Sequence, residues 1–404
     1  MLLGKVKNLE VLHRNTAAMN SIDDIDIQGQ EVLLRTDLNL PIEDGEPQKT
    51  VRFKRYLETV EELSDRGAKT VVMAHQGRPG RNDFMSLKKH SEILSDSLGN
   101  EVEFIPGFFG PELAEAVEDM DEGGVALLEN VRFLSEELRN ASAEQHAEDI
   151  FVKRIAPEFD LYVDDAFSAA HRSHGSMVGF TKKLDSYAGP VMEKELESCG
   201  KVRDRFDNGV LVLGGEKPSD LIGILDEMIE SVDKVLLGGI PGELALIIEG
   251  HDLGEKKQWI EDHGLDSKKG ELERVINNYS EKVVLPEDVR TDSGEYRVEE
   301  IPDEMTWDIG PETAEKFAEE IRDAESVVMK GPMGAFEEHP EGTRKIVKAM
   351  AESDAYTVLG GGHTSSLVQR FNYELEDFSH VSIAGGAFVR YLSGEKLAAV
   401  EALR

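Results

Sequence analysis

Arginine and histidine side chains come directly after the short apolar segments in the first half of this chain. They follow four successive segments and are Arg35, His75, Arg78, Arg132, His171, Arg172 and His174. A guanidinium matches carboxylate and phosphate geometry through parallel hydrogen bonds. Because the carboxyl ends of parallel strands meet at one edge of a sheet, we expect these cations to converge. The pattern predicts a site for a small polyanionic substrate, and a surface ion pair at each arginine is the alternative.

The apolar segments of the second half are followed instead by glycine-rich turns. These turns are Gly214-Gly215-Glu216-Lys217, Gly238-Gly239, Gly331-Pro332-Met333-Gly334, Gly360-Gly361-Gly362-His363-Thr364 and Gly385-Gly386-Ala387. Glycine lets the backbone approach a phosphate closely, and the next helix supplies N–H groups. The turns predict a nucleotide site, with close packing of helix on strand as the alternative. The chain has neither a Walker-type phosphate loop nor the dinucleotide fingerprint, so this would be a nucleotide site of another design.

Together the two halves predict an enzyme that holds a small anion on one domain and a nucleotide on the other. Direct phosphoryl transfer across a cleft is the reaction class that suits such a pair of sites. It relies on positioning and charge, and we expect no phospho-enzyme.

Ten short apolar segments alternate with stretches of helical spacing, which indicates parallel α/β sheets. The segments are residues 32–34, 71–73, 125–128, 161–163, 210–213, 235–237, 283–285, 327–329, 356–359 and 381–383. Helical spacing is clear in residues 56–64, 87–98, 314–321 and 343–350. Ten strands exceed what one open sheet comfortably holds, so we expect two sheets in two domains. We place the boundary near Gly189-Pro190, with residues 192–205 forming a linking helix.

Composition limits the class of protein further. The 404 residues include 45 Lys and Arg against 81 Asp and Glu, a net charge of −36, which argues against nucleic-acid binding. No apolar run approaches the roughly 18 residues of a membrane span, and no secretory signal is apparent. The single cysteine, Cys199, excludes an intramolecular disulfide. We expect a cytoplasmic protein adapted to multimolar salt, with a merely acidic mesophilic protein as the alternative.

The motifs resemble those of phosphoglycerate kinases from about Met19 to the C-terminus. In the first half they are residues 34–41 (LRTDLNLP), 74–79 (AHQGRP), 128–133 (LENVRF) and 163–172 (VDDAFSAAHR). In the second half they are residues 213–217 (LGGEK), 308–311 (DIGP), 330–337 (KGPMGAFE) and 360–364 (GGGHT). The resemblance is closest to the archaeal members. It implies two Rossmann-like domains that close about a hinge, and transfer between 1,3-bisphosphoglycerate and ADP to give 3-phosphoglycerate and ATP.

The same resemblance implies roles for individual residues. The phosphoglycerate site would consist of Asp37, Asn39, Arg52, His75, Arg78, Arg132 and Arg172. Arg52 and Lys217 would be catalytic, because the family uses them to neutralise the phosphoryl group in flight. Nucleotide binding would fall to Lys217, Glu337, Gly361, Gly362, His363 and Thr364, with Glu337 on the ribose hydroxyls.

Four positions depart from the family's common form. His363 stands where that form has a metal-binding aspartate, and Leu221 stands where it has a second lysine. Histidine is a poor ligand for magnesium, so we expect Mg²⁺ to be held by nucleotide phosphates and water, with no protein ligand. Lys330 replaces an asparagine and either restores positive charge near the phosphates or is a solvated surface lysine. Asp164 replaces another asparagine.

The predicted organisation follows from the motif positions. Residues 1–18 would be an extension or a mis-assigned start, 19–189 the phosphoglycerate domain, 190–207 the linker helix and 208–389 the nucleotide domain. Residues 390–404 would return to the first domain. We expect a monomer or homodimer without nucleic-acid or membrane partners. A two-domain dehydrogenase and a catalytically weak protein that binds phosphoglycerate and nucleotide are the alternative functions.

Overall fold

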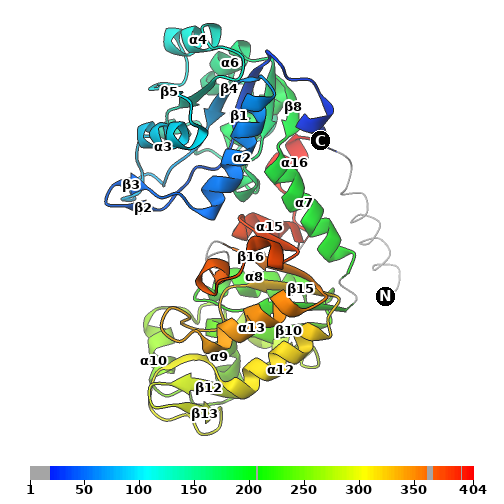
Figure 1. Ribbon diagram of the computed structural model, residues 1–404. Helices are drawn as coiled ribbons and strands as arrows, with labels where there is room; N and C mark the ends of the chain where they lie inside the picture. Colours follow the sequence, from blue (N-terminus) through cyan, green and yellow to red (C-terminus); the bar gives the residue numbers. More distant parts are fainter. Residues whose placement is uncertain (1–18, 206–207, 362–366, 393) are drawn as a thin grey trace. The chain divides into compact units, whose positions relative to one another are not determined.

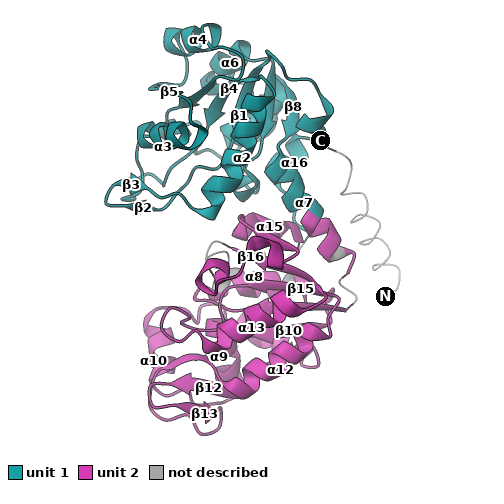
Figure 2. Ribbon diagram, viewed as in Figure 1, with its two compact units in different colours: residues 1–197, 394–404 teal, residues 198–393 magenta. Residues whose placement is uncertain are grey.

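The computed structural model describes residues 19–205, 208–361, 367–392 and 394–404 (Figure 1). The chain divides into two compact units (Figure 2). Unit 1 holds the described residues up to Glu197 together with Gly394–Arg404, and unit 2 is Ser198–Ser393. The division falls within helix α7 (Pro190–Arg203), so the predicted linker helix contributes residues to both units. The predicted N-terminal extension, residues 1–18, lies outside the described residues.

Unit 1 contains a six-stranded sheet in which every pairing is parallel. The spatial order is β5-β6-β4-β1-β7-β8. Its strands are β1 (Glu31–Arg35), β4 (Lys69–Met73), β5 (Val102–Ile105), β6 (Val125–Leu128), β7 (Leu161–Asp164) and β8 (Asp185–Ala188). A short antiparallel hairpin follows β1 and consists of β2 (Ile42–Glu43) and β3 (Glu46–Pro47).

Helices cover both faces of this sheet (Figure 1), which is why its central strands β1 and β4 each contain a continuous apolar run. Val32 and Leu34 pack with Phe53 of α2 and Leu94 of α3 on one face. Leu33 packs on the other face, against residues of α4 and α6. The helices of unit 1 are α2 (Val51–Asp65), α3 (Lys88–Leu98), α4 (Pro111–Glu118), α5 (Ala143–His146), α6 (Ile150–Ile155) and α16 (Ala398–Ala402). Ala399 of α16 donates its N–H to the Ala170 carbonyl at 3.0 Å, within unit 1.

Unit 2 repeats the plan with a second parallel six-stranded sheet. Its order is β11-β10-β9-β15-β16-β17. The strands are β9 (Gly209–Leu213), β10 (Lys234–Leu237), β11 (Val283–Val284), β15 (Ser326–Lys330), β16 (Tyr356–Gly360) and β17 (His380–Ser382). Val210 and Val212 pack on this sheet against Phe317 of α12 and Ile346 of α13.

Unit 2 also carries a small antiparallel sheet of order β13-β12-β14. Its strands are β12 (Asp288–Thr291), β13 (Glu295–Arg297) and β14 (Thr306–Ile309). The helices are α8 (Pro218–Met228), α9 (Gly239–Ile248), α10 (Glu255–Asp262), α11 (Lys269–Asn278), α12 (Pro311–Arg322), α13 (Glu341–Glu352) and α15 (Gly385–Leu392). Among the described residues, no helix is both long and apolar enough to span a membrane.

The predicted fold class, two parallel α/β domains of the Rossmann-like kind, is confirmed, and all ten predicted segments contain strands. The prediction missed β5 and β8, the two edge strands of the first sheet. An edge strand is less fully buried and tolerates polar residues, as Glu103 and Asp185 show by their exposure. The antiparallel sheet was also missed.

Each parallel sheet has one point at which the order of strands reverses. In unit 1 this point lies between β1 and β7, because strands β4, β5 and β6 all lie on the other side of β1. In unit 2 the corresponding neighbours are β9 and β15. Ligands bind beyond the carboxyl ends of the strands at such points. The fold therefore directs attention to the loops that follow β1, β7, β9 and β15.

Candidate active site

Asp37 is the centre of the loop that follows β1. It is 1% exposed, and its Oδ1 accepts the N–H of Asn39 at 2.9 Å. Its Oδ2 accepts the hydroxyl of Ser168, which comes from the loop after β7. The same oxygen lies 3.5 Å from Nη1 of Arg52. One carboxylate thus connects the two loops of the unit 1 switch point and holds an arginine beside them.

Three amide side chains join the loops after β1, β4 and β6. Asn39 Oδ1 accepts the N–H of Gly77 at 2.8 Å. Gln76 Oε1 accepts the N–H of Leu40 at 2.9 Å, and Gln76 Nε2 donates to the Leu40 carbonyl at 3.0 Å. Asn130 Nδ2 donates to the Gln76 carbonyl at 2.8 Å. These bonds leave the loops with little freedom to rearrange, so the charged side chains on them start from fixed backbone positions.

Arg52 lies in the first turn of α2. Thr50 caps this helix by accepting the N–H of Phe53 at 3.3 Å, which sets where the helix begins. The N-terminus of a helix carries a partial positive charge and attracts anions. Arg52 adds a full charge at the same place.

The cationic side chains of unit 1 are close enough to perturb one another. Burial lowers the pKa of His75 well below its ordinary value, and the charges of Arg35, Arg172, His174 and Arg52 lower it further. Burial lowers the pKa of the Arg172 guanidinium too, together with the charges of Arg78 and Arg35. Such mutual repulsion is relieved when an anion binds among the groups.

The predicted phosphoglycerate residues therefore come together at one place in unit 1. Arg78 is exposed, whereas Arg132 is 5% exposed and donates through Nη1 to the Gly77 carbonyl. We call the predicted cations of this site the cation cluster; they are Arg52, His75, Arg78, Arg132 and Arg172. Arg35 does not belong to it, because that side chain is 1% exposed and its nitrogens contact Ser176, Thr36 and His75.

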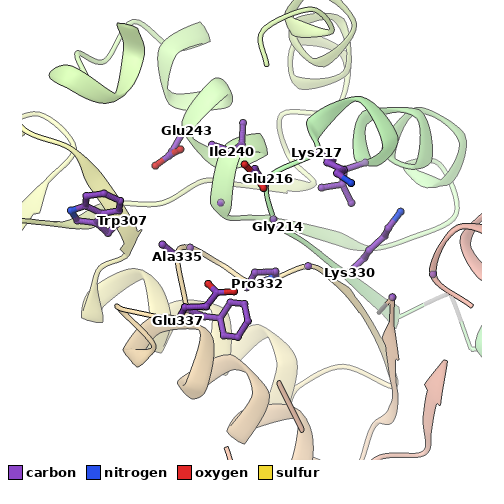
Figure 3. Close-up of a pocket in the computed structure, with 18 of the residues that line it drawn as sticks. Gly214, Glu216, Lys217, Ile240, Glu243, Trp307, Lys330, Pro332, Ala335 and Glu337 are labelled. Carbon is purple, nitrogen blue, oxygen red and sulfur yellow. The ribbon is translucent and has the colours of Figure 1, made fainter. Parts of the chain in front are cut away.

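Unit 2 has a cavity of about 610 Å³ at its own switch point. This volume is within the range of small-molecule sites. The lining includes the loops after β9 and β15 and the start of α9, as Figure 3 shows. Gly214, Lys217, Lys330, Glu337 and Gly361 all contribute to its wall.

Two glycines at the switch point allow the loops to pack on each other. A Cβ on Gly214 would lie 2.1 Å from the Pro332 carbonyl, and one on Gly331 would lie 2.1 Å from that of Gly214. Gly331 also has φ of +81°, which favours glycine. At these two positions glycine is required by the close approach of one loop to the other, an explanation that was not predicted from the sequence.

Two lysines mark one side of the cavity. Lys217 and Lys330 lie on the same side in Figure 3, with Glu337 on another part of the wall. Lys217 directly precedes the first turn of α8, where helical N–H groups begin. Leu221 also lines the cavity, as an apolar residue only 3% exposed. Lys330 contributes to the cavity wall, which favours positive charge near the phosphates over a solvated surface lysine.

The opposite side of the cavity is aromatic. Both tryptophans of the chain, Trp259 and Trp307, line it. The Lys256 ammonium lies 4.9 Å from the Trp259 ring centre and 5.8 Å from that of Trp307. Glu243 lies 3.5 Å from the same ammonium and accepts the hydroxyl of Thr306 at 2.6 Å. The aromatic side suits a flat ring such as a nucleobase, and the side formed by Lys217 and Lys330 suits anionic phosphates.

Three predicted nucleotide residues, Gly362, His363 and Thr364, lie outside the described residues. Within the described part of the chain, no three His, Cys, Asp or Glu side chains gather as ligands for a metal ion. Magnesium requires several oxygen ligands in near-octahedral geometry. The described residues therefore do not fit a magnesium site formed by protein ligands alone.

Comparison with known proteins identifies the family. The phosphoglycerate kinase family model matches residues 22–395. The chain belongs to the phosphoglycerate kinase family. A phosphoglycerate kinase of Halorubrum lacusprofundi is 44% identical, over 96% of this chain and 98% of that protein. One from Haloarcula marismortui is 41% identical, over 95% and 99% of the two chains. This family assignment argues against the alternative of a two-domain dehydrogenase.

Solved structures agree with this assignment. The crystal structure of phosphoglycerate kinase from Pyrococcus horikoshii superposes with a TM-score of 0.89 at 34% identity. It covers 95% of this chain, and 98% of the Pyrococcus chain is matched. Phosphoglycerate kinase from Coxiella burnetii gives a TM-score of 0.78 at 28% identity, with 96% and 99% covered.

Several residues that shape the site were not predicted from the sequence. Gln76 and Asn130 stand inside motifs that carried the family resemblance, so their position next to the site could have been inferred. Ser168 is in the same situation. Trp259, Trp307 and Glu243 had no such signal, because they lie outside the quoted motifs and reach the cavity only through folding.

Proposed function

We propose that the protein catalyses reversible phosphoryl transfer between 1,3-bisphosphoglycerate and ADP, giving 3-phosphoglycerate and ATP. Phosphoglycerate binds the cation cluster of unit 1, and the nucleotide binds the cavity of unit 2. The observation that carries this proposal is the pairing of two sites, each at the switch point of its own sheet, in a phosphoglycerate kinase chain. One site is rich in cations, and the other is nucleotide-sized with lysines on one side.

The chemistry follows from the charges. A carboxylate oxygen of 3-phosphoglycerate attacks the γ-phosphorus of ATP in line, the bond to the ADP oxygen breaks, and an acyl phosphate forms. Arg52 neutralises the equatorial oxygens during transfer, and Lys217 does so from the nucleotide side. Before substrate binds, the pairing with Asp37 holds Arg52 at the site. No side chain accepts the phosphoryl group.

The remaining residues bind and orient the substrates. Asp37, Asn39, His75, Arg78, Arg132 and Arg172 hold phosphoglycerate, and Glu337 holds the ribose hydroxyls of the nucleotide. Gly361, Gly362, His363 and Thr364 complete the nucleotide site. Mg²⁺ would be held by the phosphate oxygens of the nucleotide and by water, and it would neutralise phosphate charge.

We further propose a cytoplasmic enzyme that works at multimolar salt, as a monomer or homodimer, without nucleic-acid or membrane partners. The support is the net charge of −36 and the similarity to phosphoglycerate kinases of Halorubrum and Haloarcula. Salt at these concentrations screens the repulsion among surface carboxylates.

A coupled assay of ATP consumption, with and without 3-phosphoglycerate, tests the proposal. We expect turnover that requires both substrates and rises steeply between low and multimolar KCl. Turnover at both salts would keep the kinase and discard the salt requirement. Binding of both substrates without turnover, by a folded protein, would favour the catalytically weak binding protein.

A further inference from the structure

Arg35 is an arginine at a strand end that does not face the proposed substrate. It ends β1 and is 1% exposed. Its Nε donates to Oγ of Ser176 at 2.9 Å, and its Nη1 donates to the carbonyl of Thr36. The remaining nitrogen, Nη2, lies 3.1 Å from Nδ1 of His75. The guanidinium is therefore committed to partners within unit 1.

The last of these contacts determines where His75 carries its proton. A guanidinium donates hydrogen bonds and cannot accept them, so Nδ1 of His75 must be the acceptor. A neutral imidazole with an acceptor Nδ1 has its proton on Nε2. His75 is 5% exposed, and burial together with the charges of Arg35, Arg52, Arg172 and His174 lowers its pKa well below the ordinary value. The ring is accordingly neutral at physiological pH.

A buried carboxylate holds this arginine in place. Glu137 is 1% exposed and accepts both the N–H and the hydroxyl of Ser176, each at 2.7 Å. The chain of contacts runs from Glu137 through Ser176 to Arg35 and then to His75. His174 Nδ1 lies 3.6 Å from the same carboxylate. Four separate segments of the chain are involved, so the orientation of the His75 ring is set from outside its own loop.

We propose that Arg35 is a positioning residue that fixes His75 in the Nε2–H tautomer, so that His75 offers phosphoglycerate a neutral N–H donor. The inference rests on the proposed function for the identity of the anion. In the other tautomer Nε2 would carry a lone pair, which repels the oxygen of a phosphate or carboxylate. The arrangement keeps this donor available over a pH range in which an ordinary histidine changes charge.

Nitrogen-15 NMR of the substrate-free protein, labelled at histidine, tests the tautomer directly. We expect the His75 signals to show a protonated Nε2 and an unprotonated Nδ1 from pH 5.5 to 8. His75→Gln assigns them among the 11 histidines. A protonated Nδ1, or titration of His75 near pH 6.5, would overturn the proposal. This measurement uses no catalysis, so it is independent of the proposed function.

Two variants test whether Arg35 is responsible. Ser176→Ala removes the hydroxyl that accepts from Nε of Arg35, while the backbone N–H of residue 176 can still donate to Glu137. Arg35→Gln removes the guanidinium that donates to His75. We expect mixed tautomers of His75 and a KM for 3-phosphoglycerate that rises several-fold, with kcat changed less. His90 is the internal control, because its Nε2 faces Gln76 Oε1 at 3.1 Å and its signals should not change.

The outcomes separate the two proposals. A His75 tautomer that stays fixed in a folded Arg35→Gln variant would overturn the role of Arg35. A shift of the Nε2 signal on adding 3-phosphoglycerate to the unsubstituted protein supports the substrate contact. A fixed tautomer with no response to 3-phosphoglycerate would show that His75 does not contact the substrate, and it would count against the proposed function. The positioning of His75 by Arg35 would still be supported.

Discussion

Asp164, the last residue of β7, is a buried carboxyl whose ionisation should weaken the fold as pH rises. It is 0% exposed, and its backbone pairs in register with Arg35 of β1. Burial raises its pKa from 3.8 to about 7, although Arg35 and the N–H of Ala166 act in the opposite direction. The Glu137 charge raises the pKa further. The native protein therefore keeps a proton that the unfolded chain releases near pH 4.

The sign of the pH effect follows from this difference. Between about pH 4 and 7 the native state binds more protons than the unfolded state at Asp164, so the free energy of unfolding falls as pH rises. Each pKa unit corresponds to about 1.4 kcal/mol, and the shift spans about three units. Between pH 5 and pH 8 the loss attributable to Asp164 is about 3 kcal/mol.

Asp164→Asn removes the ionisation and keeps an oxygen for the Ala166 N–H, which Oδ1 now accepts at 3.0 Å. Relative to the unsubstituted protein, we expect the free energy of unfolding of the variant to rise by about 3 kcal/mol between pH 5 and pH 8. The asparagine is also the residue that the family often has at this position. A smaller advantage at pH 8 than at pH 5, or none that changes with pH, would refute the reasoning.

The assay is urea unfolding at fixed high salt between pH 5 and pH 8, followed by circular dichroism and tryptophan fluorescence. Both tryptophans belong to unit 2, so fluorescence serves as an internal reference while circular dichroism reports on both units. Asp185→Asn is the matched control, because Asp185 is an exposed carboxyl on the neighbouring strand β8. It should show no comparable change with pH.

Three further predictions concern the two substrates. Arg78→Ala should raise the KM for 3-phosphoglycerate about tenfold or more, the scale of one charged hydrogen bond, and a rise only in the nucleotide KM would contradict the assignment. Lys330→Met should raise the nucleotide KM by about the same factor, and an unchanged KM would favour a surface lysine. ADP should change the intrinsic fluorescence, and Trp307→Phe should reduce that change, because Trp307 lines the cavity. An equal response in both proteins would show that the nucleobase does not bind beside Trp307.

The central strands were predictable because burial on both faces makes their sequences continuously apolar, as at Val32-Leu33-Leu34. The edge strands were harder to predict from the sequence. Strand β8 reads Asp-Ser-Tyr-Ala and has no apolar run, so only its pairing with β7 identifies it as a strand. Strand β13 is held by its pairing with β12 and is likewise polar. Such strands form because a neighbour supplies hydrogen bonds.

The candidate site was predictable in composition and less so in function. Position after a strand correctly grouped Arg78 and Arg172, whose charges influence each other. The same rule grouped Arg35 with them, but burial and the contact with Ser176 turn that side chain inward. Ser176 is 141 residues from Arg35, and no local pattern encodes a contact over that separation. The partners of a charge, rather than its position after a strand, determine its role.

Arg52→Ala tests the central claim most directly, in the assay of 3-phosphoglycerate-dependent ATP consumption at multimolar KCl. Loss of one preorganised charge beside the transferred group should cost about 3 kcal/mol, which lowers kcat by roughly two or more decades. The protein should still fold, since Arg52 is partly exposed in the first turn of α2. An unchanged kcat would remove Arg52 from catalysis and contradict phosphoryl transfer at the cation cluster.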